Sequence, residues 1–293
     1  MGSRCDWRYN HDMFMITNRC GRNLRGFVFA ALGLLMTTPI VAQDESVQAD
    51  TDPATLARQS ARAFQAGDHE QALDLADRAV AIDPEHARLR QFRGEMRFRA
   101  NRIEGSVEDF DEAVRLEPAL GPYNWQRGIA LYYAKRYADG AAQFESHRSV
   151  NGSDVENPVW HFLCVARHES LGAARERVLP VGFDSRVPMT EIYQMFLGNS
   201  SPEQVIEKAR ENEERLTAGQ MESRLFYAHL YVGLYLDITG EEREALPHIR
   251  KAADEIGPAH YMGDVARVHL ADLTKRLEQP ENTGVPAAGD EAE

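Results

Sequence analysis

Cysteine is scarce in this chain: its 293 residues contain three, Cys5, Cys20 and Cys164. The first two lie in an N-terminal segment with the features of an export signal, described below. If that segment is removed, one cysteine remains, and no intramolecular disulfide can form even in an oxidising compartment. Because 43% of the residues are hydrophobic, the chain can bury a real core, and its stability must come from packing.

Basic residues are also few. Lysine and arginine total 33 against 46 aspartates and glutamates, which gives a net charge of −13. Such a chain would repel a nucleic-acid backbone unless its basic residues were gathered in one patch, and the sequence contains no such patch. The composition therefore predicts that nucleic acid is not a partner.

The chain has no long hydrophobic run. Its most apolar stretch, residues 26 to 42, includes two threonines and falls short of the ~20 residues that comfortably span a bilayer. Arg19, Arg22 and Arg25 precede this stretch, and small and β-branched residues lead up to Ala42, as in a secretory signal. We expect cleavage after Ala42; an uncleaved membrane anchor is the alternative.

The residue that follows the apolar run bears on lipid anchoring. A bacterial lipid anchor would require a cysteine there, and position 43 is glutamine. The sequence therefore predicts an exported protein, periplasmic or associated with the cell envelope, with no lipidation cysteine after its signal.

The sequence does contain an internal repeat. The dipeptides Asp83-Pro84 and Glu117-Pro118 lie 34 residues apart, each closing a pattern of two short amphipathic helices. This is the period of tetratricopeptide repeats, in which small residues let helix backbones approach and aromatic side chains fill the remaining space. The same offset separates Gly94 from Gly128 and Phe110 from Phe144.

The repeat predicts an all-α fold, a right-handed helical solenoid of the tetratricopeptide type with an irregular helical middle. The expected organisation is a signal peptide (1–42), an acidic leader (43–52), three N-terminal repeat units (53–152), an irregular helical segment (153–222), a C-terminal unit with a capping helix (223–278), and a disordered tail (279–293).

Local signals place individual helix ends. Gly67-Asp68 predicts the turn between the first two helices, and Pro84 blocks continuation of the second. Residues 159 to 172 are interpreted as one amphipathic helix. Further on, Ser201 is the expected N-cap of a helix that carries Pro202 at its first position. Residues 263 to 277 predict the capping helix.

In a tetratricopeptide stack the first helix of each pair lines a concave groove, which here would have an aromatic and apolar floor with arginines at one side. Such a groove suits an extended or helical peptide bearing acidic and hydrophobic groups. The candidate residues are Arg88, Gln91, Phe98, Arg99, Trp125, Ile129, Tyr132 and Tyr133.

Two alternatives to an open peptide groove stand beside it. The aromatic side chains can equally be interhelical packing, and the two arginines can be solvated surface charges. A further alternative is a structural dimer whose groove is filled by its own tail, residues 279 to 293.

A second candidate site lies at His161, Cys164 and His168, which share one face of a predicted helix. Two imidazoles and a thiolate could bind zinc, and the alternative function is therefore a metal-dependent or thiol enzyme. The competing interpretation places Cys164 partly in the core with the histidines flanking it. Because a fourth ligand and other catalytic motifs are absent from the sequence, we expect no enzyme activity, metal or cofactor.

Three stretches carry a family resemblance: "RGIALYYAKR" (127–136), "EIYQMFLGN" (191–199) and "FYAHLYVGLYLDITGE" (226–241). Together they resemble the NlpI family of exported bacterial tetratricopeptide lipoproteins, over most of residues 53 to 275. The resemblance implies a homodimeric, non-enzymatic adaptor that docks envelope proteases and peptidoglycan hydrolases.

The signal interpretation predicts the mass of the exported protein. Intact mass spectrometry of material recovered from the envelope should match a chain that begins at Gln43. A mass that retains residues 1 to 42 would contradict cleavage and favour the membrane anchor.

Overall fold

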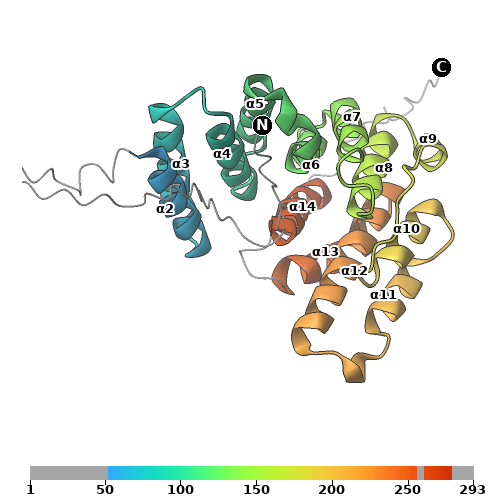
Figure 1. The fold of residues 1–293 in the computed structure, drawn as a ribbon. Helices are drawn as coiled ribbons and strands as arrows, with labels where there is room; N and C mark the ends of the chain where they lie inside the picture. The colour runs from blue at the N-terminus through green and yellow to red at the C-terminus, as the bar shows by residue number, and fades with distance from the viewer. Residues whose placement is uncertain (1–51, 256–260, 279–293) are drawn as a thin grey trace, which may run out of the picture. The chain divides into compact units, whose positions relative to one another are not determined.

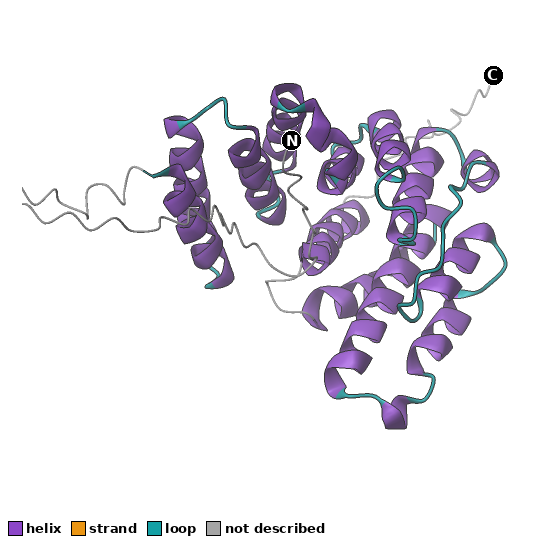
Figure 2. Cartoon of the chain, in the orientation of Figure 1, coloured by secondary structure: helices purple, strands orange, loops and turns teal. Residues whose placement is uncertain are grey.

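The computed structural model describes residues 52–255 and 261–278. Over these ranges the regular structure is helical throughout and contains no strand, which confirms the predicted all-α class (Figure 2). The predicted signal, most of the acidic leader and the predicted tail lie outside the described residues.

Three helix pairs follow one another from the N-terminal side, and the two helices of each pair pack together (Figure 1). A short 3-10 helix, η1 (Pro118–Tyr123), lies between the second pair and the third. The pairs are α2 (Pro53–Gln65) with α3 (His69–Ile82), α4 (Ala87–Arg99) with α5 (Ile103–Leu116), and α6 (Trp125–Tyr133) with α7 (Tyr137–His147).

The 34-residue period appears in the backbone of the turns inside these pairs. Gly67, Asn101 and Lys135 lie at that spacing, and all three adopt left-handed conformations, with φ of +83°, +58° and +59°. Asp68 then caps α3 with its side chain, so the predicted Gly67-Asp68 turn is confirmed. Left-handed backbone is unfavourable for most residues, so its recurrence marks one turn geometry repeated three times.

Small residues allow the helices of a pair to approach closely, as the sequence predicted. A Cβ atom on Gly128 would lie 2.6 Å from Cζ of Phe144, and one on Gly94 would lie 3.1 Å from the Phe110 ring. Both rings are fully buried. The glycine and the aromatic residue at each 34-residue offset therefore face each other across a pair.

The middle of the chain contains α8 (Glu156–His168), α9 (Leu171–Glu176), α10 (Met189–Leu197), α11 (Pro202–Arg210) and the 3-10 helix η2 (Glu213–Arg215). One continuous helix over 159–172 was expected, and that prediction is wrong. Glu169 leaves helical geometry at φ −123°, ψ −74°, and the Ser170 hydroxyl accepts a hydrogen bond from Ala173 N, which starts α9. The predicted start of α11 is confirmed, because Ser201 caps it with Pro202 at its first position.

The C-terminal part contains α12 (Ala218–Thr239), α13 (Glu242–Glu255) and α14 (Tyr261–Glu278). α12 begins before the expected boundary at 223, because Thr217 and Gln220 form a capping box there. The expected capping helix is α14, which packs along α13 and also reaches α4 (Figure 1). In the described ranges, no helix is both long and apolar enough to cross a membrane.

Gly128→Ala tests the close approach inside the third pair. We expect a loss of about 1 to 3 kcal/mol in the free energy of unfolding, because the buried Phe144 ring has no room to move aside. The matched control is Gly219→Ala near the start of α12, where an added Cβ meets nothing within 4 Å. Urea denaturation should leave the control unchanged or slightly stabilised; equal effects at both positions would contradict the packing argument.

Candidate binding groove

The eight predicted groove residues lie on two neighbouring helices, α4 and α6. At the start of α4, Arg88 is exposed and Gln91 is half-buried. Gln91 donates a hydrogen bond from Nε2 to Oε1 of Glu95, at 3.4 Å. Of the eight predicted residues, Arg88 at the start of α4 is the one that is exposed to solvent.

At the other end of α4, an aromatic cluster encloses the first residue of α14. The buried Phe98 ring stacks on Tyr261, with ring centroids 5.5 Å apart and planes 13° apart. Trp125 of α6 meets the same tyrosine edge-on at 5.1 Å. Two predicted groove residues from different repeat units therefore hold one side chain of α14.

An ion pair lies beside this aromatic cluster. Arg99 donates from Nε to Oδ2 of Asp264 at 2.5 Å, and its guanidinium lies over the Phe64 ring of α2, 4.1 Å from the centroid. Asp264, with its side chain 2% exposed, also accepts from Arg267 of α14. A carboxylate this deeply buried depends on the guanidinium groups around it, because a buried charge without a partner would lack solvation.

The remaining groove residues of α6 divide into two roles. Tyr133 places its hydroxyl 3.2 Å from Nδ1 of His269 on α14. Ile129 and Tyr132 are buried in the main core, where Tyr132 packs edge-on against Trp160. Four of the eight predicted residues thus contact α14, at Phe98, Arg99, Trp125 and Tyr133, while these two are core packing.

The far end of α14 is held by a buried carboxylate. Asp237 of α12 has a side chain 1% exposed and accepts hydrogen bonds from Arg167 of α8 and Arg276 of α14, each at 2.8 Å. His269 Nε2 lies 3.5 Å from the same carboxylate. Burial lowers the pKa of His269 to about 4, so this imidazole is neutral at physiological pH.

Glu95 is a buried acid on the groove side of α4. Its side chain is 4% exposed and receives hydrogen bonds from the amide groups of Gln91 and Gln126, each at 3.4 Å. Burial raises its pKa to about 7, against the opposing effect of the positive charge on Arg99. The groove therefore contains a carboxyl group that is partly protonated near neutral pH.

Polar atoms at the contact between α14 and the groove are incompletely paired. Trp125 Nε1 and the Tyr261 hydroxyl are buried without a hydrogen-bond partner among the described residues, and so is Oε1 of Gln126, the residue after Trp125 on α6. Each such atom costs about 1 to 3 kcal/mol relative to a paired one. Aromatic packing and an ion pair thus hold α14 against α4 and α6, while these polar atoms lack hydrogen-bond partners.

The structure does not assemble the second candidate site. His161 is buried and places Nε2 3.2 Å from Oε1 of Glu145, and Cys164 is buried against Gly140. Burial lowers the pKa of His161 and raises that of the Cys164 thiol, while His168 is exposed at the end of α8. Across residues 52–255 and 261–278, no group of three or more His, Cys, Asp or Glu side chains could hold a metal ion.

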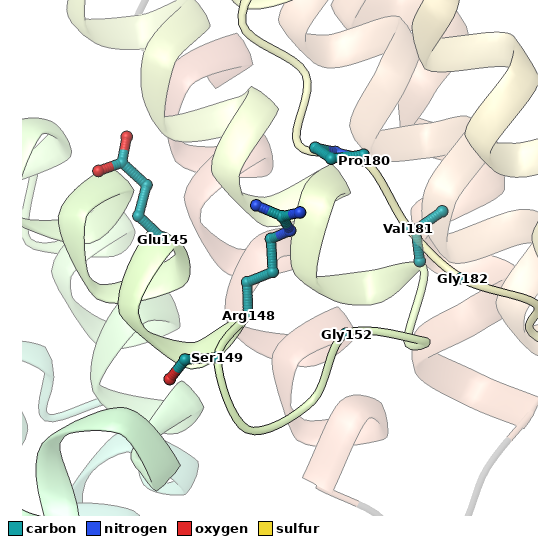
Figure 3. A pocket seen from close by; sticks show the side chains of 7 residues that line it. All are labelled: Glu145, Arg148, Ser149, Gly152, Pro180, Val181 and Gly182. Carbon is teal, nitrogen blue, oxygen red and sulfur yellow. The ribbon is translucent and has the colours of Figure 1, made fainter.

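A separate open pocket of about 540 Å³ lies between the end of α7 and the segment that leads to α10. Figure 3 shows the Arg148 side chain extending from the α7 end toward this segment. One guanidinium, one carboxylate and a few apolar groups favour no single class of ligand. The pocket is lined by Glu145, Arg148, Ser149, Gly152, Pro180, Val181 and Gly182.

Comparison with known proteins identifies the repeats. No protein-family model matches the chain. Two curated relatives are both Tetratricopeptide repeat protein 28: the Mus musculus protein is 28% identical over 119 residues, and the Homo sapiens protein is 32% identical over 89. The similarity supports a tetratricopeptide-type repeat protein.

The matched segments cover 41% and 30% of this chain but only 5% and 4% of the two relatives. Among solved structures, "Structure of Naa15/Naa10 bound to HypK-THB" is 16% identical, with a TM-score of 0.34. That match covers 78% of this chain and 36% of the other.

The residues of α14 that contact α4 and α6 were not among the predicted site residues. Tyr261, Asp264 and His269 lie in or beside the segment predicted to cap the stack, and no periodic signal indicates that a capping helix also reaches α4. Glu95 could have been found, because it lies four residues after Gln91 and therefore on the same helical face.

Glu95→Gln tests the buried acid through the pH dependence of stability. The folded state binds the Glu95 proton more tightly than the unfolded state, so its contribution to stability is full below the ordinary pKa of 4.5 and is lost as pH rises through about 7. Relative to wild type, the glutamine variant should therefore gain about 2 to 3 kcal/mol between about pH 4 and about pH 8.

The measurement is urea unfolding of both proteins across this pH range, with Glu104→Gln, an exposed position on α5, as the control. The control should follow the wild-type pH dependence. A Glu95→Gln variant that also follows it would show that the pKa of Glu95 is the same in the folded and unfolded states, which would contradict the raised pKa.

Proposed function

We propose that this protein is an exported adaptor, a tetratricopeptide scaffold that holds protein partners in the cell envelope. Tetratricopeptide-type repeats support a protein-interaction scaffold, because stacked helix pairs present a continuous concave surface rather than an enclosed reaction site. The curated relatives share this repeat type over a small part of their length.

The observation that carries the proposal is the chemistry with which α4 and α6 hold a helix. Phe98 and Trp125 enclose an aromatic side chain, and Arg99 pairs with an aspartate three residues further along the bound helix. Aromatic and arginine side chains are those that most often dominate protein interfaces. This agrees with the ligand expected from the sequence, a peptide with hydrophobic and acidic groups.

The proposed location and the proposed partners are argued from features of the sequence. The arginines before the apolar run and the small residues up to Ala42 support export, and glutamine at position 43 makes lipid anchoring at that place impossible. The resemblance to the NlpI family supports envelope proteases or peptidoglycan hydrolases as partners and a homodimer as the assembly.

Site-specific photo-crosslinking tests the groove as the partner surface. A crosslinking residue at Arg88, exposed at the open end of α4, should capture envelope proteins that the same residue at Glu108, exposed on α5, does not. The Arg88 and Glu108 variants should show wild-type circular dichroism, since neither side chain is buried.

Mass spectrometry of the crosslinked products identifies the captured proteins. Equal capture at both positions, or capture at Glu108 alone, would move the partner surface to another face. Absence of captured protein at every exposed position tried would argue against an adaptor function.

A further inference from the structure

We propose that α14 is a resident ligand of the groove, and that the protein's partner is an amphipathic helix with an aromatic residue followed three residues later by aspartate, which displaces α14 from α4 and α6. This inference rests on the proposed adaptor function and specifies the chemistry of its partner. It follows from what α4 and α6 present to α14 and from how α14 is attached elsewhere.

The attachment of α14 is uneven along its surface. It packs much more closely along α13 than along α4. Its directional contacts with α4 and α6 are the two rings around Tyr261, the Arg99–Asp264 pair and the contact between Tyr133 and His269. A competing helix would have to replace these contacts and the buried apolar side chains beside them, Val265 and Ala266.

The groove limits what can replace α14. Arg99 lies between the Phe64 ring and Asp264, with its side chain only 13% exposed, so a displacing helix with a carboxylate at the same place would restore the buried ion pair. The space between Phe98 and Trp125 is filled by a ring and must be filled by another. An aromatic residue at i and aspartate at i+3 lie on one helical face and meet both requirements.

A partner helix can make a hydrogen bond that α14 does not make at its contact with α4 and α6. Trp125, which packs against Tyr261, has a buried Nε1 donor without an acceptor among the described residues. A partner helix that places an acceptor within reach of Trp125 Nε1 makes a hydrogen bond that the resident helix leaves unmade. A partner helix that makes this additional hydrogen bond can therefore compete with α14 for the same surface.

The test uses the exported chain and a synthetic, fluorescein-labelled peptide of residues 261 to 278. In fluorescence anisotropy, Tyr261→Ala in the chain should bind the peptide roughly tenfold more tightly than wild type does, because the in-cis helix has lost its ring contact. The matched control is Lys275→Ala, which removes an exposed side chain from the other end of α14 and should behave as wild type.

Sequence dependence is tested on the peptide itself. A peptide carrying the Tyr261→Ala and Asp264→Asn substitutions should bind the Tyr261→Ala chain at least roughly tenfold more weakly than the unsubstituted peptide. If both peptides bind equally, or if the folded variant binds neither, the proposal is overturned.

Hydrogen exchange on the wild-type chain supplies a measurement that does not depend on a variant that folds. Saturating peptide should lower the protection of amides in residues 261 to 270 and leave the α12 core, residues 230 to 234, unchanged. Unchanged protection of α14 would reject displacement. A wild-type dimer formed by exchange of α14 would assign the groove to a second copy and overturn the proposal.

Failure here can be separated from failure of the adaptor function. If partners crosslink at Arg88 while the peptide leaves α14 in place, the groove binds proteins beside α14 and only displacement is rejected. If neither occurs, the groove itself is not the partner surface.

Discussion

The buried carboxylate of Asp237 is the contact on which the arrangement of the C-terminal helices depends. It lies on α12 and accepts hydrogen bonds from Arg167 of α8 and Arg276 of α14, so one aspartate joins three helices that are distant in sequence. Because the charge is nearly excluded from solvent, removal of either arginine would leave the carboxylate under-compensated. Together with the packing of α14 along α13, this contact fixes where α14 lies.

The surface of α4 and α6 that α14 covers combines aromatic rings with an arginine. A ring from each of two repeat units encloses Tyr261, and an arginine backed by an aromatic face pairs with Asp264. These are contacts of the kind seen at protein interfaces, made here within one chain. The buried Glu95 beside them adds a carboxyl group whose pKa burial raises to about 7.

The repeats were predictable because their constraint is local. Gly94 and Gly128 each face an aromatic side chain of the next helix, and Gly67, Asn101 and Lys135 each turn the chain with the same left-handed geometry. The packing requirement selects the same residue types every 34 residues and is therefore visible in the sequence, whereas the turn position is glycine, asparagine and lysine in the three pairs. The break between α8 and α9 was harder to predict, because Ser170 follows an apolar pattern typical of one continuous helix. Its capping role depends on the local backbone conformation.

The sequence by itself determined the helical class and the repeat period, because helix periodicity and close helix contacts act over a few tens of residues. Only the tertiary structure decided what lies against the predicted groove residues. Phe98 and Tyr261, or Arg99 and Asp264, are more than 150 residues apart, and no periodic signal links them, since their contact depends on the accumulated rotation of every intervening helix. The same reason explains why His161, Cys164 and His168 form no site. That they share one helical face is a local property, whereas the burial and the contacts of each side chain are set by the helices packed around α8.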